Sequence, residues 1–272
     1  MGDLRLGICT IQRDRARWLP EWVAFHHAAG FRKFYIFLHR CADDSEAVVR
    51  RLQQRFDIQC FVLGADVERP QLAAYQYAYQ QFNHEVDWMA FVDGDEFLFA
   101  PHGGDLQSIM QGYQYQKISS LGVWWVCYGS NGHIREPEGL IIENYQMRPE
   151  LTHLNNRHFK CIVRGHLGEA VSVGMNAHTF NTPYGTVDEH LRPLQGGYMP
   201  ETEPTYDLLR INHYVCQSLE YFKTFKQNSG MADAGANAIR SDDIWHRDNI
   251  NAVHDTSAWR HLDEVKSLLQ GV

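Results

Sequence analysis

The sequence lacks the features of several large classes of protein. No apolar run approaches the roughly 18 residues of a membrane-spanning helix, and the first residues do not place a basic segment before an apolar one, as a secretory signal does. The formal net charge is −8, so there is no strongly basic footprint for duplex nucleic acid. We therefore expect a cytoplasmic protein with no nucleic-acid partner and no transmembrane segment, for which peripheral association with a membrane stays open.

Familiar catalytic and metal-binding patterns are also missing. The 6 cysteines are far apart and include no C-x-x-C pair, which favours reduced thiols over a disulfide framework. The 15 histidines occur without the H-E-x-x-H spacing of zinc enzymes. The P-loop, the G-x-S-x-G elbow and the G-x-G-x-x-G fingerprint are absent, which excludes several classes of nucleotide-binding enzyme and hydrolase.

The residues that are present predict an α/β fold. Hydrophobic residues make up 44% of the 272, which is enough for a sizeable core. Strand-like segments alternate with helical ones: strands are expected at 4–11, 33–38, 58–63 and 88–92, and helices around Pro20, from Ser45 to about residue 56, and from Pro70. This alternation predicts a mostly parallel sheet flanked by helices. Ligands of such sheets bind beyond the carboxyl ends of the strands.

The second half is less regular and has an α+β pattern. Strands are expected at 117–128, 158–164 and 208–213, a long loop at 181–206, and helices at 219–226 and 258–269. No linker-like change in composition divides the chain. We expect a single domain over residues 1–272, with internal boundaries at about 115 and 230 and a C-terminal helical segment over about 231–272.

The sharpest chemical feature is the turn Asp93-Gly94-Asp95-Glu96, directly after the strand expected at 88–92. Two carboxylates with one residue between them can converge on one hard cation, and Gly94 lets the backbone approach a ligand closely. A bare D-x-D also occurs as a solvated acidic turn, but its place at a strand end favours a metal site. A cation held there would neutralise charge that develops on a leaving phosphate.

The motifs around this turn resemble, in order, those of glycosyltransferase family 92 and its bacterial relatives in the glycosyltransferase family 2-like group. The resemblance covers about residues 4–230, and the ordered series is more specific than any single motif. It consists of Gln12-Arg13-Asp14, Leu19-Pro20-Glu21-Trp22, His26, Gly30, the polar stretch 41–45, the D-x-D-E-F-L segment 93–98, the Gly-rich turn 128–133, Lys160 to Arg164, His178 to Phe180, Asn212-His213-Tyr214, Ser218 to Phe222, and Lys226.

The resemblance implies a GT-A fold, in which about residues 1–115 bind a nucleotide-sugar and about residues 116–230 bind the acceptor. It implies a glycosyltransferase that uses Mn²⁺ or Mg²⁺ and commonly a UDP-sugar, acts on a glycan or glycolipid, as in polysaccharide biosynthesis, and inverts the anomeric centre. Two departures are Gln12-Arg13-Asp14 in place of Lys-Asn-Glu, and Asn131 in place of a serine.

The resemblance and the strand ends together give candidate donor-side residues. The expected metal ligands are Asp93, Asp95 and His213. The expected nucleotide-sugar contacts are Thr10, Asp14, Asp43, Asp44, Asp93, Gly94, Asp95, Lys160 and Lys226. A structural role is the alternative for several of them: a core histidine for His213, and charges at a helix N-terminus for Asp43 and Asp44. Glu21, Gln71 and Tyr75 are expected to be structural.

Acceptor contacts and the catalytic base are expected in the second half. The acceptor candidates are Trp124, Trp125, His133 and His178; because neighbouring residues of a strand point to opposite faces, at most one of the two tryptophans lines the site. Inversion needs a carboxylate that deprotonates the acceptor hydroxyl. Of the acidic residues in this half, which are Glu136, Glu143, Glu169, Asp188 and Glu189, we take Glu143 and Asp188 as the candidates.

Two other classes of function stay open. A metal-dependent phosphohydrolase or nucleotidyltransferase would use the same acidic pair, but it normally needs further clustered carboxylates for a second metal. None stands out near Asp93 and Asp95 in the sequence. The other alternative is a binding protein on a catalytically degenerate GT-A fold, against which the joint presence of Asp93, Asp95 and His213 argues.

Overall fold

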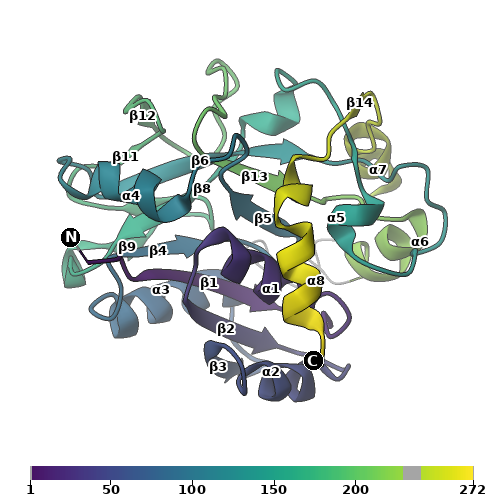
Figure 1. Ribbon diagram of the computed structural model, residues 1–272, viewed down its shortest axis with the longest axis horizontal. Coiled ribbons are helices and arrows are strands. Elements are labelled where there is room, and N and C mark those ends of the chain that lie inside the picture. The colour runs from purple at the N-terminus through teal and green to yellow at the C-terminus, as the bar shows by residue number, and fades with distance from the viewer. Residues whose placement is uncertain (1, 229–239, 272) are drawn as a thin grey trace.

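A ten-stranded mixed sheet runs through the computed structural model, which describes residues 2–228 and 240–271 (Figure 1). The sheet order is β12-β11-β6-β8-β4-β1-β2-β3, with β13 paired to β6 and β5 paired to β13. Its strands are β1 (Leu6–Gln12), β2 (Lys33–His39), β3 (Asp57–Leu63), β4 (Trp88–Phe91), β5 (Glu96–Phe99), β6 (Ser120–Cys127), β8 (Phe159–Arg164), β11 (Thr186–Val187), β12 (Pro193–Leu194) and β13 (Arg210–His213). Two short two-stranded sheets pair β9 (Ser172–Val173) with β10 (Phe180–Asn181), and β7 (Met147–Arg148) with β14 (Val253–His254).

Helices connect and cover these strands. The α-helices are α1 (Leu19–Ala29), α2 (Ser45–Leu52), α3 (Pro70–Phe82), α4 (Leu106–Gln114), α5 (Ile141–Asn144), α6 (Leu219–Tyr221), α7 (Asp242–Asp248) and α8 (Leu262–Leu269). Short 3₁₀ turns occur at η1 (Leu154–Arg157), η2 (Gly168–Ala170) and η4 (Ser257–His261), and the π-helical turn η3 (Phe222–Lys226) continues α6. None of the described helices is both long and apolar enough to cross a bilayer.

The predicted α/β class with a mostly parallel sheet is confirmed. Strand β1 pairs in parallel with β2 and β4, and β2 pairs in parallel with β3. Antiparallel β8 joins β4 to β6, so strands from both halves of the chain belong to one sheet. The carboxyl ends of β1, β2 and β4 therefore lie at the same edge of this sheet, where ligands of open α/β sheets bind.

Helix α1 shows how local sequence sets an element that supports the site. Pro20 lies in its first turn, where a missing N–H costs no hydrogen bond. Gly30 ends it with a φ of 120°, a conformation that residues with a Cβ rarely adopt. Trp22 and Phe25 are buried against the sheet, and α8, yellow in Figure 1, packs along α1 in front of the sheet. The first and last thirds of the chain are thereby held together.

Two predicted helices differ from the structure in detail. The helix expected to run to about residue 56 ends at Leu52, because the following residues tighten into i→i−3 hydrogen bonds. Ser45 is its first helical residue, and the Ser45 hydroxyl accepts a hydrogen bond from the backbone N of Arg15 at 3.0 Å. The helix expected at 258–269 begins as the 3₁₀ turn η4 and becomes α-helical at Leu262.

The long loop expected at 181–206 contains two strands, β11 and β12, that extend the main sheet. Two buried carboxylates shape this segment. Asp188 accepts hydrogen bonds from the backbone N of His190 and from Arg192, and Glu189 accepts three from backbone N atoms at Asp207 to Leu209. Strand β5 was not predicted, because Glu96 to Phe99 is too short a run to separate from the turn before it.

Glu21 on α1 gives the fold a predicted pH dependence. Its buried carboxylate accepts hydrogen bonds from Ile141 N at 2.7 Å and Ile142 N at 3.0 Å, at the start of α5. Burial raises the pKa of Glu21 from 4.5 to about 7 despite these bonds. The native state thus holds a proton that the unfolded chain loses, so this stabilising contribution is complete below pH 4.5 and is lost as the pH rises through 7.

We expect Glu21→Gln to gain stability relative to the wild type between pH 4.5 and 8, by at most about 3 kcal/mol. Urea unfolding at both pH values measures the difference. Glu264→Gln, at an exposed position on α8, is the control and should show no such trend. If the difference in the free energy of unfolding between wild type and Glu21→Gln did not change with pH, the pKa of Glu21 would not be raised in the native state.

Candidate active site

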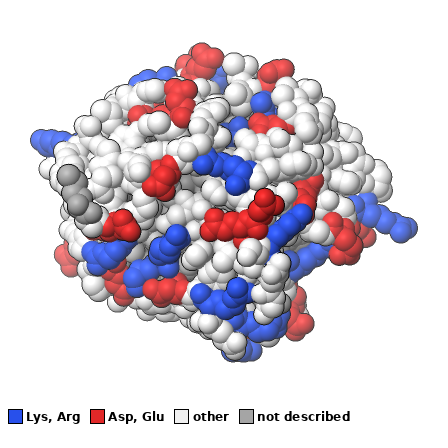
Figure 2. Space-filling model, viewed as in Figure 1, with Lys and Arg blue, Asp and Glu red and all other residues white. Residues whose placement is uncertain are grey.

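A cavity of 1190 Å³ lies at the carboxyl ends of the parallel strands. Its lining includes the last residue of β1 (Gln12) and the residue after it (Arg13), the residue after β2 (Arg40), the turn after β4 (Asp93 to Asp95) and the end of β13 (His213). Pockets for one drug-sized ligand hold roughly 300–1,000 Å³, so this cavity has room for more than one substrate. Among the described residues on the face drawn in Figure 2, acidic and basic side chains are interspersed rather than gathered into one basic field.

Asp93 is held by three side chains. Its Oδ1 lies 3.0 Å from Lys160 Nζ and 3.1 Å from the Tyr75 hydroxyl, and it also accepts a hydrogen bond from Gln71 Nε2. Burial acts to raise the pKa of Asp93, but the charge of Lys160 outweighs it, so the pKa lies below its ordinary value. Asp93 is therefore a carboxylate at neutral pH, with Lys160 as its counterion.

Asp95 is paired with a different set of residues. Its Oδ2 forms an ion pair with Lys226 and lies 3.7 Å from His213 Nε2. Burial opposes ionisation, yet Lys226 and His213 hold the pKa of Asp95 well below its usual range. The two carboxylates of the turn therefore each have their own lysine, and both lysines come from the second half of the chain.

The backbone between the two carboxylates is closely packed. The Gln12 side chain fills the space that a Cβ at Gly94 would need, so no other residue fits there without a shift. Gln12 is held in turn by a 2.9 Å hydrogen bond to Thr10 Oγ1. Arg15 donates a 2.8 Å hydrogen bond to the Gly94 carbonyl and another to the Tyr221 hydroxyl. The buried Arg15 guanidinium thus joins the end of β1 to the turn and to α6.

The second half of the chain supplies an aromatic side of the cavity. Trp125 lines it, with its ring 4.2 Å from that of His213 and 4.8 Å from that of His158. Trp124 points to the opposite face of β6, where it is 1% exposed and packs on Phe159. The expectation that at most one of these tryptophans lines the site holds, and Trp124 belongs to the core. His178 also lines the cavity.

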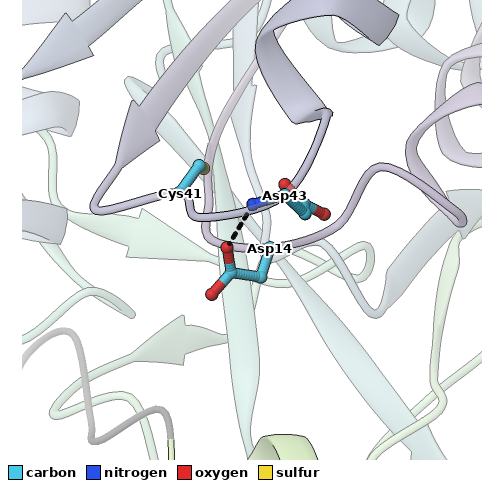
Figure 3. Close-up of side chains that lie close together, drawn as sticks. All are labelled: Asp14, Cys41 and Asp43. Atoms are coloured by element: carbon cyan, nitrogen blue, oxygen red, sulfur yellow. Dashed lines mark hydrogen bonds between the residues drawn. The ribbon is translucent and has the colours of Figure 1, made fainter.

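Several candidates lie outside the described cavity lining. Asp14 and Asp43 connect the loops after β1 and β2: Asp14 Oδ1 accepts from Ala42 N and Asp43 N (Figure 3), and Asp43 accepts from Ala16 N and Ser45. The other candidates outside the lining are Thr10, Asp44, His133, Glu143 and Asp188. Among the bases considered, Glu143 pairs with Lys266 at 2.6 Å, and Asp188 pairs with Arg192 within its own loop.

The expected metal ligands are only partly brought together. In the described part of the chain, two groups place three potential ligand atoms within 4.8 Å of one another: Asp14 with Cys41 and Asp43, and Glu189 with His190 and Asp207. Asp93, Asp95 and His213 do not form such a group. Asp95 Oδ2 and His213 Nε2 are nevertheless 3.7 Å apart, and the buried His213 Nδ1 has no hydrogen-bond partner. An oxygen and a nitrogen at this separation fit a divalent cation between them.

The structure also adds residues that the sequence analysis had taken as structural or had not considered. Gln71 and Tyr75, expected to be structural, both donate hydrogen bonds to Asp93 Oδ1. Arg15 could have been considered, because it follows the predicted end of β1 by a few residues. His158 and the α7 residues that line the cavity carried no comparable signal, since nothing in the sequence indicates that these segments return to the strand ends.

Comparison with known proteins gives a consistent family. The family model of glycosyltransferase family 92 matches residues 3–232. The chain is similar to a glycosyltransferase family 92 protein of Oryza sativa subsp. japonica, at 26% identity over 221 residues, which is 79% of this chain and 34% of that protein. It is also similar to one of Ricinus communis, at 27% identity over 219 residues, which is 79% of this chain and 36% of that protein. The chain thus spans about a third of the length of the curated relatives it matches.

Similarity to solved structures is weaker. TarS of S. aureus, residues 1–349, aligns with a TM-score of 0.39 and 13% identity, covering 59% of this chain and 47% of that chain. A complex of the same protein with UDP-GlcNAc aligns with a TM-score of 0.37 and 16% identity, covering 59% and 45% of the two chains. These scores are too low to carry a functional argument.

Proposed function

Since the chain belongs to glycosyltransferase family 92, we propose that it transfers a sugar from a nucleotide-sugar, a UDP-sugar, to a hydroxyl of a glycan or glycolipid. The bond between the anomeric carbon and the diphosphate oxygen breaks, and the acceptor oxygen forms a new bond to that carbon and gives up its proton. We propose that the transfer inverts the anomeric centre, as the resemblance implies. The observation that carries the proposal is the Asp93-Gly94-Asp95 turn, with a lysine on each carboxylate, at the strand ends of a cavity large enough for two substrates.

The donor diphosphate is the proposed partner of the two lysines. Lys160 and Lys226 now bind carboxylates, and a donor diphosphate would bring two further negative charges into the same cavity, one for each lysine. Asp93 is then available to accept a hydrogen bond from the ribose. The Arg15 contact with the Gly94 carbonyl keeps the turn in place while these partners change.

We further propose that Asp95 and His213 would hold Mn²⁺ or Mg²⁺ together with the donor. Such a cation supplies positive charge beside the leaving diphosphate. Because Lys226 occupies Asp95 when no donor is present, a cation alone must compete with the lysine. We therefore expect the cation and the nucleotide to bind more tightly together than either binds alone.

Inversion requires a carboxylate that reaches the acceptor hydroxyl. Glu143 and Asp188, the candidates from the sequence, are paired outside the cavity lining. Among the described residues, the second half contributes one carboxylate to that lining, Asp248 of α7. Its contacts are considered below.

Calorimetric titration with UDP, in Mn²⁺ and in EDTA, tests this function. We expect wild-type protein to bind UDP in Mn²⁺, and binding to weaken at least tenfold in EDTA and in Asp95→Asn, which loses a charged metal ligand. Asp263→Asn, at an exposed position on α8, removes the same charge far from the cavity lining and should bind like the wild type. At 100 times its Kd, UDP should stabilise the fold by about 2.7 kcal/mol, which a melting curve detects.

Each part of the proposal would be contradicted by a different result. If UDP binding does not change in EDTA or in Asp95→Asn, the proposed metal site is wrong. The absence of binding by UDP and by other nucleoside diphosphates would remove the donor proposal and favour a degenerate binding protein. Release of inorganic phosphate from nucleotides without sugar transfer would favour the phosphohydrolase.

A further inference from the structure

Helix α7 brings to the cavity residues that lie outside the family match, which ends at residue 232. Ile244, Arg247 and Asp248 of this helix line the cavity. The helix is fixed to the preceding π-helical turn by the ring contact of Trp245 with Phe222, whose centroids are 5.2 Å apart. It is fixed to the acceptor half by a 2.7 Å hydrogen bond from Asn155 Nδ2 to Asp248 Oδ1.

Asp248 has an unsatisfied capacity to accept hydrogen bonds. Its side chain is 7% exposed, and it accepts one bond from Asn155 and two from Arg247, at 2.6 and 2.9 Å. A carboxylate offers about four acceptor positions, so these three bonds leave one. Because Asp248 lines the cavity, a ligand there can supply the remaining donor.

Next to Asp248 is a continuous wall of rings. The His158 ring stacks on Trp125 with centroids 4.8 Å apart, and Tyr198 lies on His158 with centroids 4.5 Å apart. Asn155 connects the two parts, since its carbonyl is 3.2 Å from His158 Nδ1 and its amide binds Asp248. His158 lies between Trp125 and Tyr198, so the ring left open to a ligand is that of Tyr198, which is 41% exposed. A flat aromatic face suits the C–H face of a pyranose ring. We call Trp125, His158, Tyr198 and Asp248 the acceptor wall.

The two histidines on and beside this wall each keep one nitrogen that accepts hydrogen bonds, while the donors here include Trp125 Nε1, which has no partner among the described residues, and Arg247, which is paired with Asp248. His158 Nδ1 faces the carbonyl of Asn155, and His178 Nδ1 lies 2.8 Å from the carbonyl of Phe159. A carbonyl only accepts, so each Nδ1 carries the proton and each neutral ring keeps a bare Nε2 lone pair. Burial lowers the pKa of both rings, that of His178 to about 3, so they stay neutral at pH 7. The remaining acceptor position of Asp248 and these lone pairs can each accept a hydrogen bond from a hydroxyl, whereas a carboxylate or phosphate in the same place has no proton to donate.

We propose that the acceptor wall binds a neutral pyranose ring of the acceptor, with Asp248 accepting a hydrogen bond from one of its hydroxyls. This inference rests on the proposed function and names its acceptor class. It makes α7 a determinant of specificity: the helix selects a hydroxyl-rich neutral sugar against a sugar that carries a carboxylate or a phosphate.

Ligand-observed NMR with simple glycosides tests the wall without knowledge of the natural acceptor. The probes are the methyl pyranosides of glucose, galactose and mannose, with methyl glucuronide as the acidic probe, each titrated into protein saturated with UDP and Mn²⁺. We expect at least one neutral probe to bind, and the glucuronide to bind about tenfold more weakly. Asp248→Asn should lower affinity for that neutral probe about tenfold, because it removes a charge-assisted hydrogen bond.

Two further variants separate loss of a sugar contact from a general loss of charge or of folding. Asp243→Asn removes the same charge from an exposed position on α7 and should bind the probe like the wild type. Tyr198→Ala removes a ring that is 41% exposed, so it should weaken probe binding without unfolding the protein, which a melting curve checks. If Asp248→Asn does not fold, the Tyr198 variant and the comparison with methyl glucuronide still test whether the acceptor wall binds a neutral pyranose.

The inference is overturned if no neutral pyranoside binds, if glucuronide binds as tightly as the neutral probes, or if folded Asp248→Asn and Tyr198→Ala both bind like the wild type. UDP binding is measured separately by calorimetry. If wild-type protein binds UDP but no pyranoside, only the inference about the acceptor wall is wrong. If wild-type protein does not bind UDP at all, the proposed function is wrong as well.

Discussion

Replacement of Lys160 by methionine is expected to lower the free energy of unfolding by about 2–3 kcal/mol at pH 8. The Lys160 side chain is 1% exposed, and its Nζ lies 3.0 Å from Asp93 Oδ1 and 3.9 Å from Glu96 Oε1. Methionine has a similar length but no charge, so the Asp93 carboxylate, whose side chain is 33% exposed, would lose its counterion. The loss of the partner of a partly buried charge costs more than the loss of a surface ion pair. Urea unfolding of both proteins measures the loss.

Lys266→Met is the matched control, because Lys266 pairs with Glu143 at 2.6 Å but its side chain is 51% exposed. Removal of a surface ion pair should cost no more than about 1 kcal/mol. If Lys160→Met and Lys266→Met lost the same stability, Lys160 would not be the counterion that holds Asp93. Lys160→Met that remains folded at low temperature should also bind UDP at least tenfold more weakly, because it lacks the charged group that we propose binds the diphosphate.

The sequence was sufficient to locate the centre of the site. The turn Asp93-Gly94-Asp95 directly follows an apolar strand. Because strands and helices alternate along this part of the chain, that strand is parallel to its neighbour β1, and the turn after it lies at the edge of the sheet where ligands bind. The family order also named Lys160 and His213, and in the structure both contact the turn. At this turn the local sequence pattern and the order of the strands point to the same place, so its position could be predicted without side-chain geometry.

Asp14 and Asp43 lie outside the described cavity lining, although the same logic named them. Both follow strand ends, as expected of ligand-binding residues, yet their carboxylates accept hydrogen bonds from backbone N atoms of neighbouring loops. A short polar side chain beside unpaired backbone donors satisfies them in preference to a ligand. Whether a loop leaves such donors unpaired depends on its backbone angles, such as the φ of 49° at Asp14, which sequence pattern does not give.

The acceptor side was less predictable for a different reason. His158, Tyr198 and Asp248 come from three segments that meet only because η1, the loop around residue 198 and α7 fold back over the sheet edge. Contacts of this kind depend on long-range packing, for which one sequence carries no periodic signal. Part of the expected C-terminal segment, residues 231–239, lies outside the described residues.

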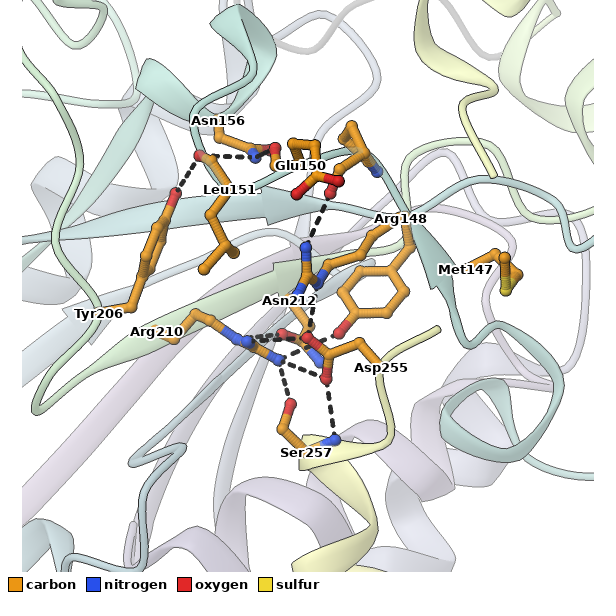
Figure 4. Close-up of polar contacts among 12 residues, drawn as sticks. Met147, Arg148, Glu150, Leu151, Asn156, Tyr206, Arg210, Asn212, Asp255 and Ser257 are labelled. Carbon is orange, nitrogen blue, oxygen red and sulfur yellow. Dashed lines mark hydrogen bonds and ion pairs between the residues drawn. The ribbon is translucent and has the colours of Figure 1, made fainter. Parts of the chain in front are cut away.

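Asp255→Ala is expected to destabilise the protein by about 3–5 kcal/mol, and so to lower the Tm by about 10 °C. Asp255 follows β14 and joins two arginines of the second half (Figure 4): it lies 2.6 Å from Arg148 Nε, and 3.1 and 3.2 Å from the two terminal nitrogens of Arg210. The Arg210 side chain is 5% exposed. Without Asp255, two guanidinium groups would remain close together in a poorly solvated place.

The same change should reach the active site, because Arg210 is on β13. Its Nε donates a 2.8 Å hydrogen bond to Asn212 Oδ1, and Asn212 is the neighbour of His213. Asp255→Asn keeps the shape of the side chain but not its charge. Its free energy of unfolding should therefore lie between that of the wild type and that of Asp255→Ala. Asp207→Ala, which removes a carboxylate 69% exposed beside His190, should cost no more than about 1 kcal/mol. If Asp255→Ala were as mild as Asp207→Ala, the C-terminal segment would not anchor β13, and the position of His213 would have to be set by its pairing with β5 and β6 alone.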